Sequence, residues 1–181
     1  VGRKLKYKNP AKAIILTQEL LRLAQQKKTV WFSTQERQAR SFIGHIYRSE
    51  RNFAASKKEF KKLIAWATEQ SDSNSIGIGY SDLAYVYSDE EKYDSASICD
   101  LMALEIRVQT NSPLLGQSYN NLGYDYKMQR VDKKALFYYK KALKFKKENG
   151  QTKSLGNTYM NISNVYKKTN LIEDATLDPW D

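Results

Sequence analysis

Residue types capable of nucleophilic, acid–base or metal chemistry are scarce in this chain. It has one cysteine, Cys99, and one histidine, His45, among 181 residues. A single cysteine can form neither an intrachain disulfide nor a cysteine metal cluster, and a single histidine excludes the zinc motifs and iron sites that need two. Only a catalytic triad built on His45 would remain available. We therefore expect a non-enzymatic protein with no metal and no cofactor, in which Cys99 is simply buried.

Positive charge offers a second kind of chemistry, the binding of acidic partners. The net charge is +10, but it is uneven: residues 71–110 have 2 Lys or Arg against 8 Asp or Glu, whereas residues 111–150 have 9 against 3. The run KKALFYYKKALKFKKENG (133–150) mixes basic and aromatic residues as nucleic-acid-binding surfaces do. Its aromatic and aliphatic positions recur at helical spacing, however, so its lysines fit a solvated helix face. We expect no specific nucleic-acid partner.

A repeated spacing of small residues must position these side chains. A small residue is followed three positions later by a tyrosine and twelve positions later by a second small residue. The pairs of small residues are Gly44/Ser56, Ala84/Ala96, Gly123/Ala135 and Ser163/Ala175, with Tyr47, Tyr87, Tyr126 and Tyr166 between them. Their first members recur at intervals of 40, 39 and 40 residues, which predicts an array of one structural unit.

The third copy shows what that unit is. Two helical stripes of packing residues are separated by a short polar turn, which predicts an antiparallel helical hairpin. The stripes are Leu115, Tyr119, Leu122, Gly123 and Tyr126, then Ala135, Leu136, Tyr139, Ala142 and Leu143. We expect the two helices to cross at Gly123 and Ala135, where a larger side chain would hold the backbones apart.

These residues resemble the tetratricopeptide repeat, in which an aromatic residue, Leu-Gly and Tyr are followed by Ala and a second aromatic residue. The third copy matches every place, and the other copies keep the same register over about residues 9–175. The period is longer than the family's usual one, and this longer form is similar to the arrays of bacterial sensor kinases, peptide-responsive bacterial regulators and kinesin light chains. The resemblance implies an all-α, right-handed superhelical solenoid of antiparallel helical hairpins.

The repeat register divides the chain into parts of a single array. Residues 9–28 form a lone second helix of a partial repeat. Residues 31–70, 71–110 and 111–150 form repeats 1 to 3, and residues 151–181 form an incomplete fourth repeat, because Pro179 is incompatible with a continued last helix. Both ends of the array should therefore leave apolar surface for another element, another domain or a second copy, as a homodimer through the exposed ends.

In such arrays the first helix of each hairpin lines the concave face, and the resemblance places a peptide-binding surface there. Asparagine is a mediocre helix former, yet it is frequent at these positions, and an amide can both donate to and accept from a peptide backbone. Lysines beside these amides favour an extended acidic peptide. The alternative is that asparagine is merely tolerated on a solvated face. The expected site residues are Asn120, Asn121, Tyr124, Lys127, Asn157, Asn161, Asn164, Lys167, Tyr85, His45 and Arg48.

The sequence and its resemblance together predict a protein- or peptide-binding module, the sensor or interaction segment of a larger bacterial signalling protein. The alternative is a structural array that dimerises or supports a neighbouring domain and has no peptide ligand. No stretch has the roughly 20 apolar residues that a membrane-spanning helix needs, so we expect no membrane insertion by this segment. The compartment stays open between a cytoplasmic location, which we favour, and a periplasmic one after removal of a signal peptide.

Overall fold

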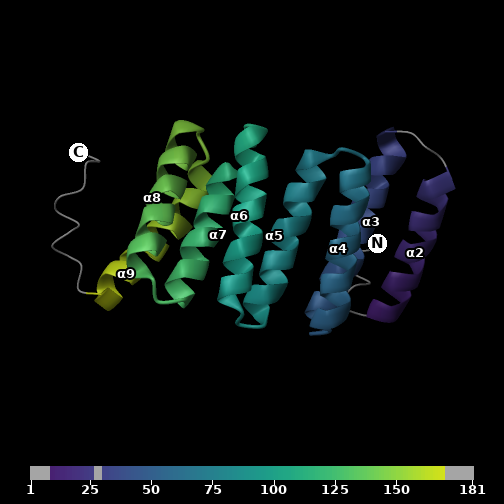
Figure 1. Cartoon of the computed structure of the whole chain (residues 1–181), viewed down its shortest axis with the longest axis horizontal. Helices are drawn as coiled ribbons and strands as arrows, with labels where there is room; N and C mark the ends of the chain where they lie inside the picture. Colours follow the sequence, from purple (N-terminus) through teal and green to yellow (C-terminus); the bar gives the residue numbers. More distant parts are fainter. Residues whose placement is uncertain (1–8, 27–29, 170–181) are drawn as a thin grey trace. The chain divides into compact units, whose positions relative to one another are not determined.

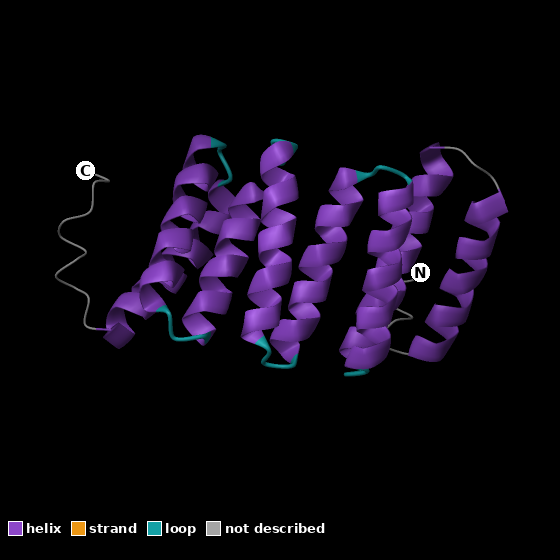
Figure 2. Cartoon of the chain, in the orientation of Figure 1, coloured by secondary structure: helices purple, strands orange, loops and turns teal. Residues whose placement is uncertain are grey.

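In the computed structural model, which describes residues 9–26 and 30–169, helices alternate with short turns (Figure 1, Figure 2). The described residues contain no strand. The all-α class and the succession of helical hairpins are therefore confirmed, whereas the superhelical path and the repeat boundaries remain predictions. The α-helices are α2 (Pro10–Gln26), α3 (Val30–Ser49), α4 (Phe53–Glu69), α5 (Ser73–Asp89), α6 (Tyr93–Gln109), α7 (Leu115–Met128), α8 (Asp132–Glu148) and α9 (Leu155–Thr169), with a short 3-10 turn, η1 (Thr152–Ser154), before α9.

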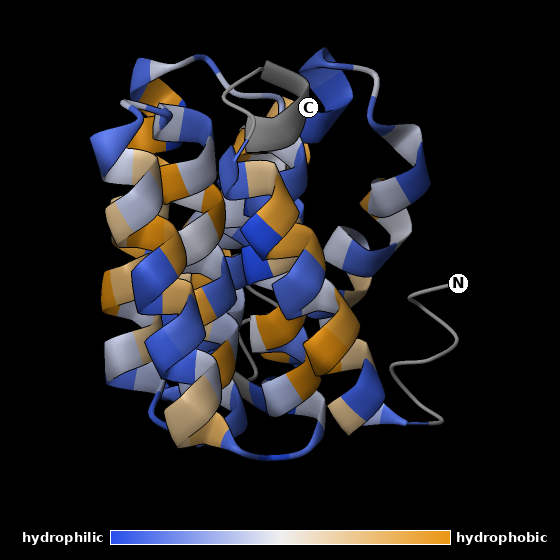
Figure 3. Ribbon diagram, turned by 90° about the vertical axis from the view of Figure 1, so that its right-hand side faces the viewer, coloured by the Kyte–Doolittle hydropathy of each residue, from blue (hydrophilic) through white to orange (hydrophobic). Residues whose placement is uncertain are grey.

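The chain divides into two compact units, Val1–Glu90 and Glu91–Asp181. In the first unit α2 packs on α3, α3 on α4, and α4 on α5. In the second unit α6 packs on α7, α7 on α8, and α8 on α9. The helices are amphipathic, and hydrophobic and hydrophilic residues alternate along them (Figure 3). Each unit thus buries a core between successive helices, as a repeat array does.

Glycine brings the two helices of a hairpin together at the predicted crossing. In the second unit a Cβ at Gly123 would lie 2.5 Å from the ring of Tyr139, and in the first unit a Cβ at Gly44 would lie 2.6 Å from the ring of Phe60. Both rings are fully buried. The Ser56 hydroxyl also donates to the Gly44 carbonyl oxygen at 2.9 Å. The small residues therefore make room for an aromatic ring sixteen positions later.

Helix ends are closed by one recurrent turn. After α7, the amide of Val131 donates to the Tyr126 carbonyl at 2.8 Å and that of Arg130 donates to the Lys127 carbonyl at 3.1 Å. This is the Schellman arrangement, which needs a left-handed residue after the helix. The left-handed residues are Arg51, Ser71, Glu91, Asn111, Arg130 and Gly150. At the other end of helices, Asn52 and Asp72 cap α4 and α5 by accepting from Ala55 and Ser75 amides.

We expected apolar surface at both ends of the array, and the structure describes only the first of them. Ala13 is buried and Ile15, Leu16, Leu20 and Leu23 of α2 are exposed, so α2 does present apolar surface. The other end, with Ala175 and Pro179, lies outside the described residues. Ser163, the small residue expected to meet Ala175, is exposed where the structure describes it.

Candidate functional site

In the first unit, the helices α3 and α5 lie close enough for polar side chains to pair at an offset of 41 residues. Arg48 donates from Nε to Asp89 Oδ2 at 2.6 Å and from a second nitrogen to Asp89 Oδ1 at 3.1 Å. The His45 Nε2 atom lies 3.4 Å from Asp82 Oδ1, and Ser41 donates to the other oxygen of Asp82 at 3.0 Å. Neighbouring first helices therefore form one polar surface in this unit.

Three of the expected site residues belong to that surface, and they lie beside carboxylates. His45 and Arg48 each face a carboxylate, and the Arg48 guanidinium also lies 5.2 Å from the centre of the half-buried Tyr85 ring. A cation already paired to a carboxylate attracts an acidic ligand less than a free one does. The pairing of Arg48 with Asp89, and the carboxylate of Asp82 beside His45, weaken the case for an acidic partner on the first unit.

The second unit repeats the same register with amides instead of charges. Asn161 of α9 donates from Nδ2 to Asn120 Oδ1 of α7 at 3.3 Å, again at an offset of 41 residues. Both side chains are half-buried, and so is Asn121, whereas Tyr124 is 41% exposed. The structure therefore brings Asn120 and Asn161 together. The other expected residues of α9, Asn157, Asn164 and Lys167, are exposed.

Two cations on this surface have no acid paired with them among the residues that the structure describes. Lys127 is half-buried at the last turn of α7, and Lys167 is exposed at the last turn of α9. Within residues 9–26 and 30–169 no carboxylate forms an ion pair with either lysine. The surface of the second unit is thus an amide pair flanked by an exposed tyrosine and positive charge. Such a surface can hydrogen-bond a peptide backbone and attract acidic side chains.

One buried cation was not among the expected site residues. Lys146 of α8 is 5% exposed, and its Nζ donates to Thr158 Oγ1 at 2.9 Å and to the Ser154 carbonyl oxygen at 3.4 Å. Thr158 Oγ1 in turn lies 3.4 Å from Asn120 Oδ1. Burial lowers the pKa of Lys146, because it disfavours the charged form. The amide pair and the buried lysine therefore belong to one polar network.

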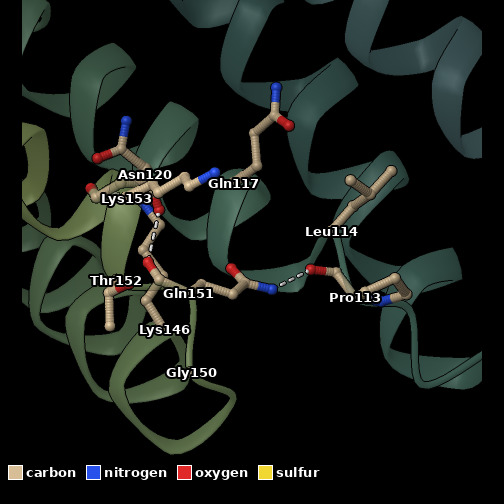
Figure 4. Close-up of a pocket in the computed structure, with 10 residues that line it drawn as sticks. Pro113, Leu114, Gln117, Asn120, Lys146, Gly150, Gln151, Thr152 and Lys153 are labelled. Atoms are coloured by element: carbon tan, nitrogen blue, oxygen red, sulfur yellow. Dashed lines mark hydrogen bonds between the residues drawn. The ribbon is translucent and has the colours of Figure 1, made fainter.

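A cavity of about 560 Å³ lies over Lys146 (Figure 4). It is bounded by the start of α7, the end of α8 and the turn before α9. Gln151 spans one side of it by donating from Nε2 to the Pro113 carbonyl oxygen at 2.8 Å. Its lining contains two lysines and three amide side chains but no carboxylate. The lining residues are Pro113, Leu114, Gln117, Asn120, Lys146, Gly150, Gln151, Thr152, Lys153 and Ser154.

The sequence did contain a signal for Lys146. It stands eleven positions after the small residue Ala135, and the corresponding places after Ala13 and Ser56 hold Ala24 and Ala67. Those two alanines are buried, so the register assigns this place to packing. A lysine at a packing place indicates a buried charge, and Arg107, eleven positions after Ala96, is a second example at 5% exposure.

The basic and aromatic run of α8 uses many of its lysines within the molecule. The Nζ atom of Lys141 lies 4.6 Å from the centre of the Phe137 ring, and that of Lys134 lies 5.1 Å from the centre of the Tyr126 ring. Tyr126 stacks on Tyr138 with 5.4 Å between ring centres. These lysines pack over aromatic rings of their own unit. That arrangement fits the prediction of a helix face better than that of a nucleic-acid surface.

Comparison with known proteins places the chain in a family. Models of the tetratricopeptide repeat match residues 38–70 and 75–148, which together make up more than half of the chain. The chain belongs to the tetratricopeptide repeat family. This fold is typically non-catalytic, and both matching models are repeat models. A comparison with curated protein sequences gives no match.

Solved structures share the fold at low sequence identity. BtubC (BKLC) from P. vanneervenii is 20% identical with a TM-score of 0.82, over 97% of this chain and 73% of that one. RapI in its apo form is 14% identical with a TM-score of 0.74, over 96% of this chain and 67% of that one. A putative kinesin light chain of Podospora anserina is 11% identical with a TM-score of 0.72, over 97% and 86%. The likeness to kinesin-light-chain-like and Rap arrays agrees with the predicted long repeat.

A membrane-spanning role finds no support in the part of the chain that the structure describes. None of the helices there combines the length and the apolar character that crossing a bilayer requires.

Proposed function

We propose that this chain is a non-enzymatic protein-binding module whose second unit holds an extended acidic peptide. The observation that carries the proposal is the surface of α7 and α9, where the Asn120–Asn161 amide pair at 3.3 Å lies among exposed or half-buried polar residues. Tetratricopeptide repeats generally serve protein interaction. A peptide backbone would pair with the amides, Tyr124 would supply flat apolar contact, and Lys127 with Lys167 would attract acidic side chains.

The acidic preference rests on the difference between the two units. In the first unit Arg48 is paired with Asp89 at 2.6 Å, whereas Lys127 and Lys167 of the second unit have no such partner among the described residues. An extended peptide that follows the first helices therefore meets uncompensated positive charge on α7 and α9. The long repeat, similar to that of sensor and regulator arrays, leads us to propose that the module is part of a larger bacterial signalling protein.

A random decapeptide display library tests this proposal. Peptides enriched on the wild-type chain should be acidic, and their affinity, measured by isothermal titration calorimetry, should fall at least tenfold in the double variant Asn121→Ala, Asn161→Ala. Removing the partner of a buried amide costs about 1–3 kcal/mol. Asn74→Ala, at an exposed asparagine of α5, is the matched control and should leave affinity unchanged. Enriched peptides without acidic residues, or equal affinity in the double variant, would refute the proposal.

A structural role is the second candidate, and α2 favours it. Ile15 is 64% exposed, Leu16 52% and Leu23 44%, so one side of this helix is apolar and open. If the array only associates through its ends, Ile15→Gln with Leu16→Gln should abolish association in light scattering, and the asparagine variant should not affect it. Two other apolar residues near the ends are less informative, because Ile14 is half-buried and Leu171 lies outside the described residues.

A further inference from the structure

We infer that the cavity over Lys146 is a binding site for a carboxylate group. The cavity measures about 560 Å³, which is more than an inorganic ion needs and enough for an acidic side chain, a peptide C terminus or a small dicarboxylate. It adjoins the peptide surface through Asn120, but it does not depend on that surface being used. A free dicarboxylate tests it without any peptide.

Lys146 is a buried charge without a counter-ion among the described residues. Lys146 is 5% exposed, and its Nζ contacts only neutral oxygens, those of Thr158 and Ser154, at 2.9 and 3.4 Å. No carboxylate in the part of the chain that the structure describes forms an ion pair with it. A buried charge is costly unless it is paired. An anion entering the cavity would supply the missing partner.

The fold makes room for this lysine. A Cβ at Gly116 would lie 2.9 Å from Lys146 Cγ and 3.1 Å from the Phe145 ring. Gly116, in the first turn of α7, is itself buried. A glycine there thus admits the lysine stem between α7 and α8. Of the other buried places of this kind, Ala24 and Ala67 hold residues that need no such space, and Arg107 holds a second long cation.

The side chains around the Lys146 charge also suit an anion. Gln117, Asn120 and Gln151 line the cavity with amides that can donate to an oxygen, Lys153 adds a second positive charge, and no acidic residue faces the ligand. Figure 4 shows Gln117, Asn120 and Lys153 on the side of the cavity opposite Gly150. The lining includes no arginine, the residue best suited to bidentate recognition of phosphate. One buried lysine matches the single negative charge of a carboxylate.

Nuclear magnetic resonance of the full chain is the test, because a single carboxylate binds weakly. Glutarate should shift the backbone amides of Gly116 and Gln151 in a saturable way at millimolar concentration. Lys146→Met keeps the buried stem and removes the charge, so it should abolish the saturable shift. Lys144→Met removes an exposed charge from the same helix and should bind glutarate like the wild type. Equal shifts in Lys146→Met, or shifts that do not saturate, would overturn the inference.

Further probes identify the source and the chemistry of the ligand. Three acetylated glycine–serine peptides serve as probes. The first has a free C terminus, the second has a C-terminal amide and one glutamate, and the third has no carboxylate. Either carboxylate peptide binding more tightly than glutarate supports a peptide ligand, and glutarate binding more tightly supports a small molecule. Binding of the carboxylate-free peptide would overturn the inference, and so would inorganic phosphate binding at least as tightly as glutarate.

Thermal melting separates this site from a merely structural lysine. Glutarate should raise the melting temperature of the wild type and of Lys144→Met but not that of Lys146→Met. If Lys146→Met fails to fold, Lys153→Met serves instead, because Lys153 is exposed and its charge lies beside the cavity. That variant should bind glutarate several-fold more weakly than the wild type. Unchanged glutarate affinity in Lys153→Met would then count against the site.

Discussion

At the scale of single residues, the second unit contains a buried pair of acids whose energetics depend on pH. Asp100 of α6 and Asp125 of α7 are each 2% exposed. Burial raises the pKa of Asp125 to about 8, with further contributions from the charge of Asp100 and from a hydrogen bond with it. In the family pattern the place of Asp100 holds an aromatic residue. Here a carboxyl pair occupies part of the core, and it is stable only when it shares a proton.

This pair predicts that stability falls as pH rises. The pKa of Asp125 is higher in the folded chain than the value of about 3.9 in an unfolded one, so the folded state binds more protons between about pH 4 and 8. The free energy of unfolding must then decrease across that window. The melting temperature should drop by several degrees from pH 5 to pH 8.5, and Asp125→Asn should flatten that dependence. Asp94→Asn, at an exposed position of α6, is the control and should retain the slope.

The crossing at Gly123 gives a second prediction at this scale. A Cβ there would lie 2.5 Å from the ring of Tyr139, which is 0% exposed and cannot move aside freely. Gly123→Ala should therefore cost about 1–3 kcal/mol of unfolding free energy, and Gly123→Leu more. Gly156→Ala in α9 is the opposite case, since no atom lies within 4 Å of its added Cβ, and it should stabilise by up to about 1 kcal/mol.

Urea unfolding curves measure both glycine variants, and a smaller ring partner provides a rescue. Tyr139→Leu in the Gly123→Ala background should recover part of the lost stability, because the two changes share one contact. Additive losses in the double variant would mean that the helices do not meet at these two residues.

At the scale of helices, the turns that end them place non-glycine residues in the left-handed region, which destabilises the folded chain. Arg130 follows α7 with φ 61°, in the left-handed region, which costs a non-glycine residue roughly 1–2 kcal/mol. Of the six left-handed residues, Gly150 avoids this cost and Asn111 reduces it. Arg130→Gly should therefore stabilise the chain by about 1 kcal/mol in chemical denaturation. Arg130→Ala removes the same side chain without freeing the backbone, so a gain of equal size in that variant would contradict this explanation.

Much of the helical arrangement was predictable, because it depends on packing places that recur. The small residues Gly44 and Gly123 mark the register, and a Cβ at Gly123 would meet Tyr139, four positions after the Ala135 at which we expected the crossing. The turns were equally visible as polar segments between helical stripes. The side chains that depart from the repeat were harder to place, because their environment depends on several helices at once. The register marks Lys146 as a packing place, but its neighbours Gly116 and Thr158 are brought to it only by the fold.

The candidate surface was predictable in part for the same reason. Helical register placed Asn120 and Asn161 on corresponding helices, and the structure shows them paired. It could not show that His45 and Arg48 face Asp82 and Asp89, since those contacts join residues 37 and 41 positions apart on different helices. The sequence therefore does not show that the charge of Arg48 is already paired with an acid.

At the scale of the whole molecule, composition alone would suggest a nucleic-acid-binding protein, with a net charge of +10 and a sequence pI of about 9.5. The distribution of that charge argues otherwise. Residues 71–110 have 8 Asp or Glu against 2 Lys or Arg, and lysines of α8 such as Lys134 and Lys141 lie over aromatic rings of their own unit. A lysine over one face of such a ring competes with stacking on bases, the contact that single-stranded nucleic acids need.

We therefore expect only weak, sequence-independent binding to duplex DNA. Fluorescence anisotropy with a labelled duplex should give a dissociation constant no tighter than the micromolar range at about 150 mM salt, because non-specific affinity comes from phosphate contacts alone. Affinity should fall steeply as salt increases, since each neutralised phosphate releases counterions. A second duplex of the same length and a scrambled sequence is the control and should bind equally. Nanomolar affinity for one duplex over the other would show that the basic face of α8 reads base edges, and the assignment of its lysines to a solvated surface would then be wrong.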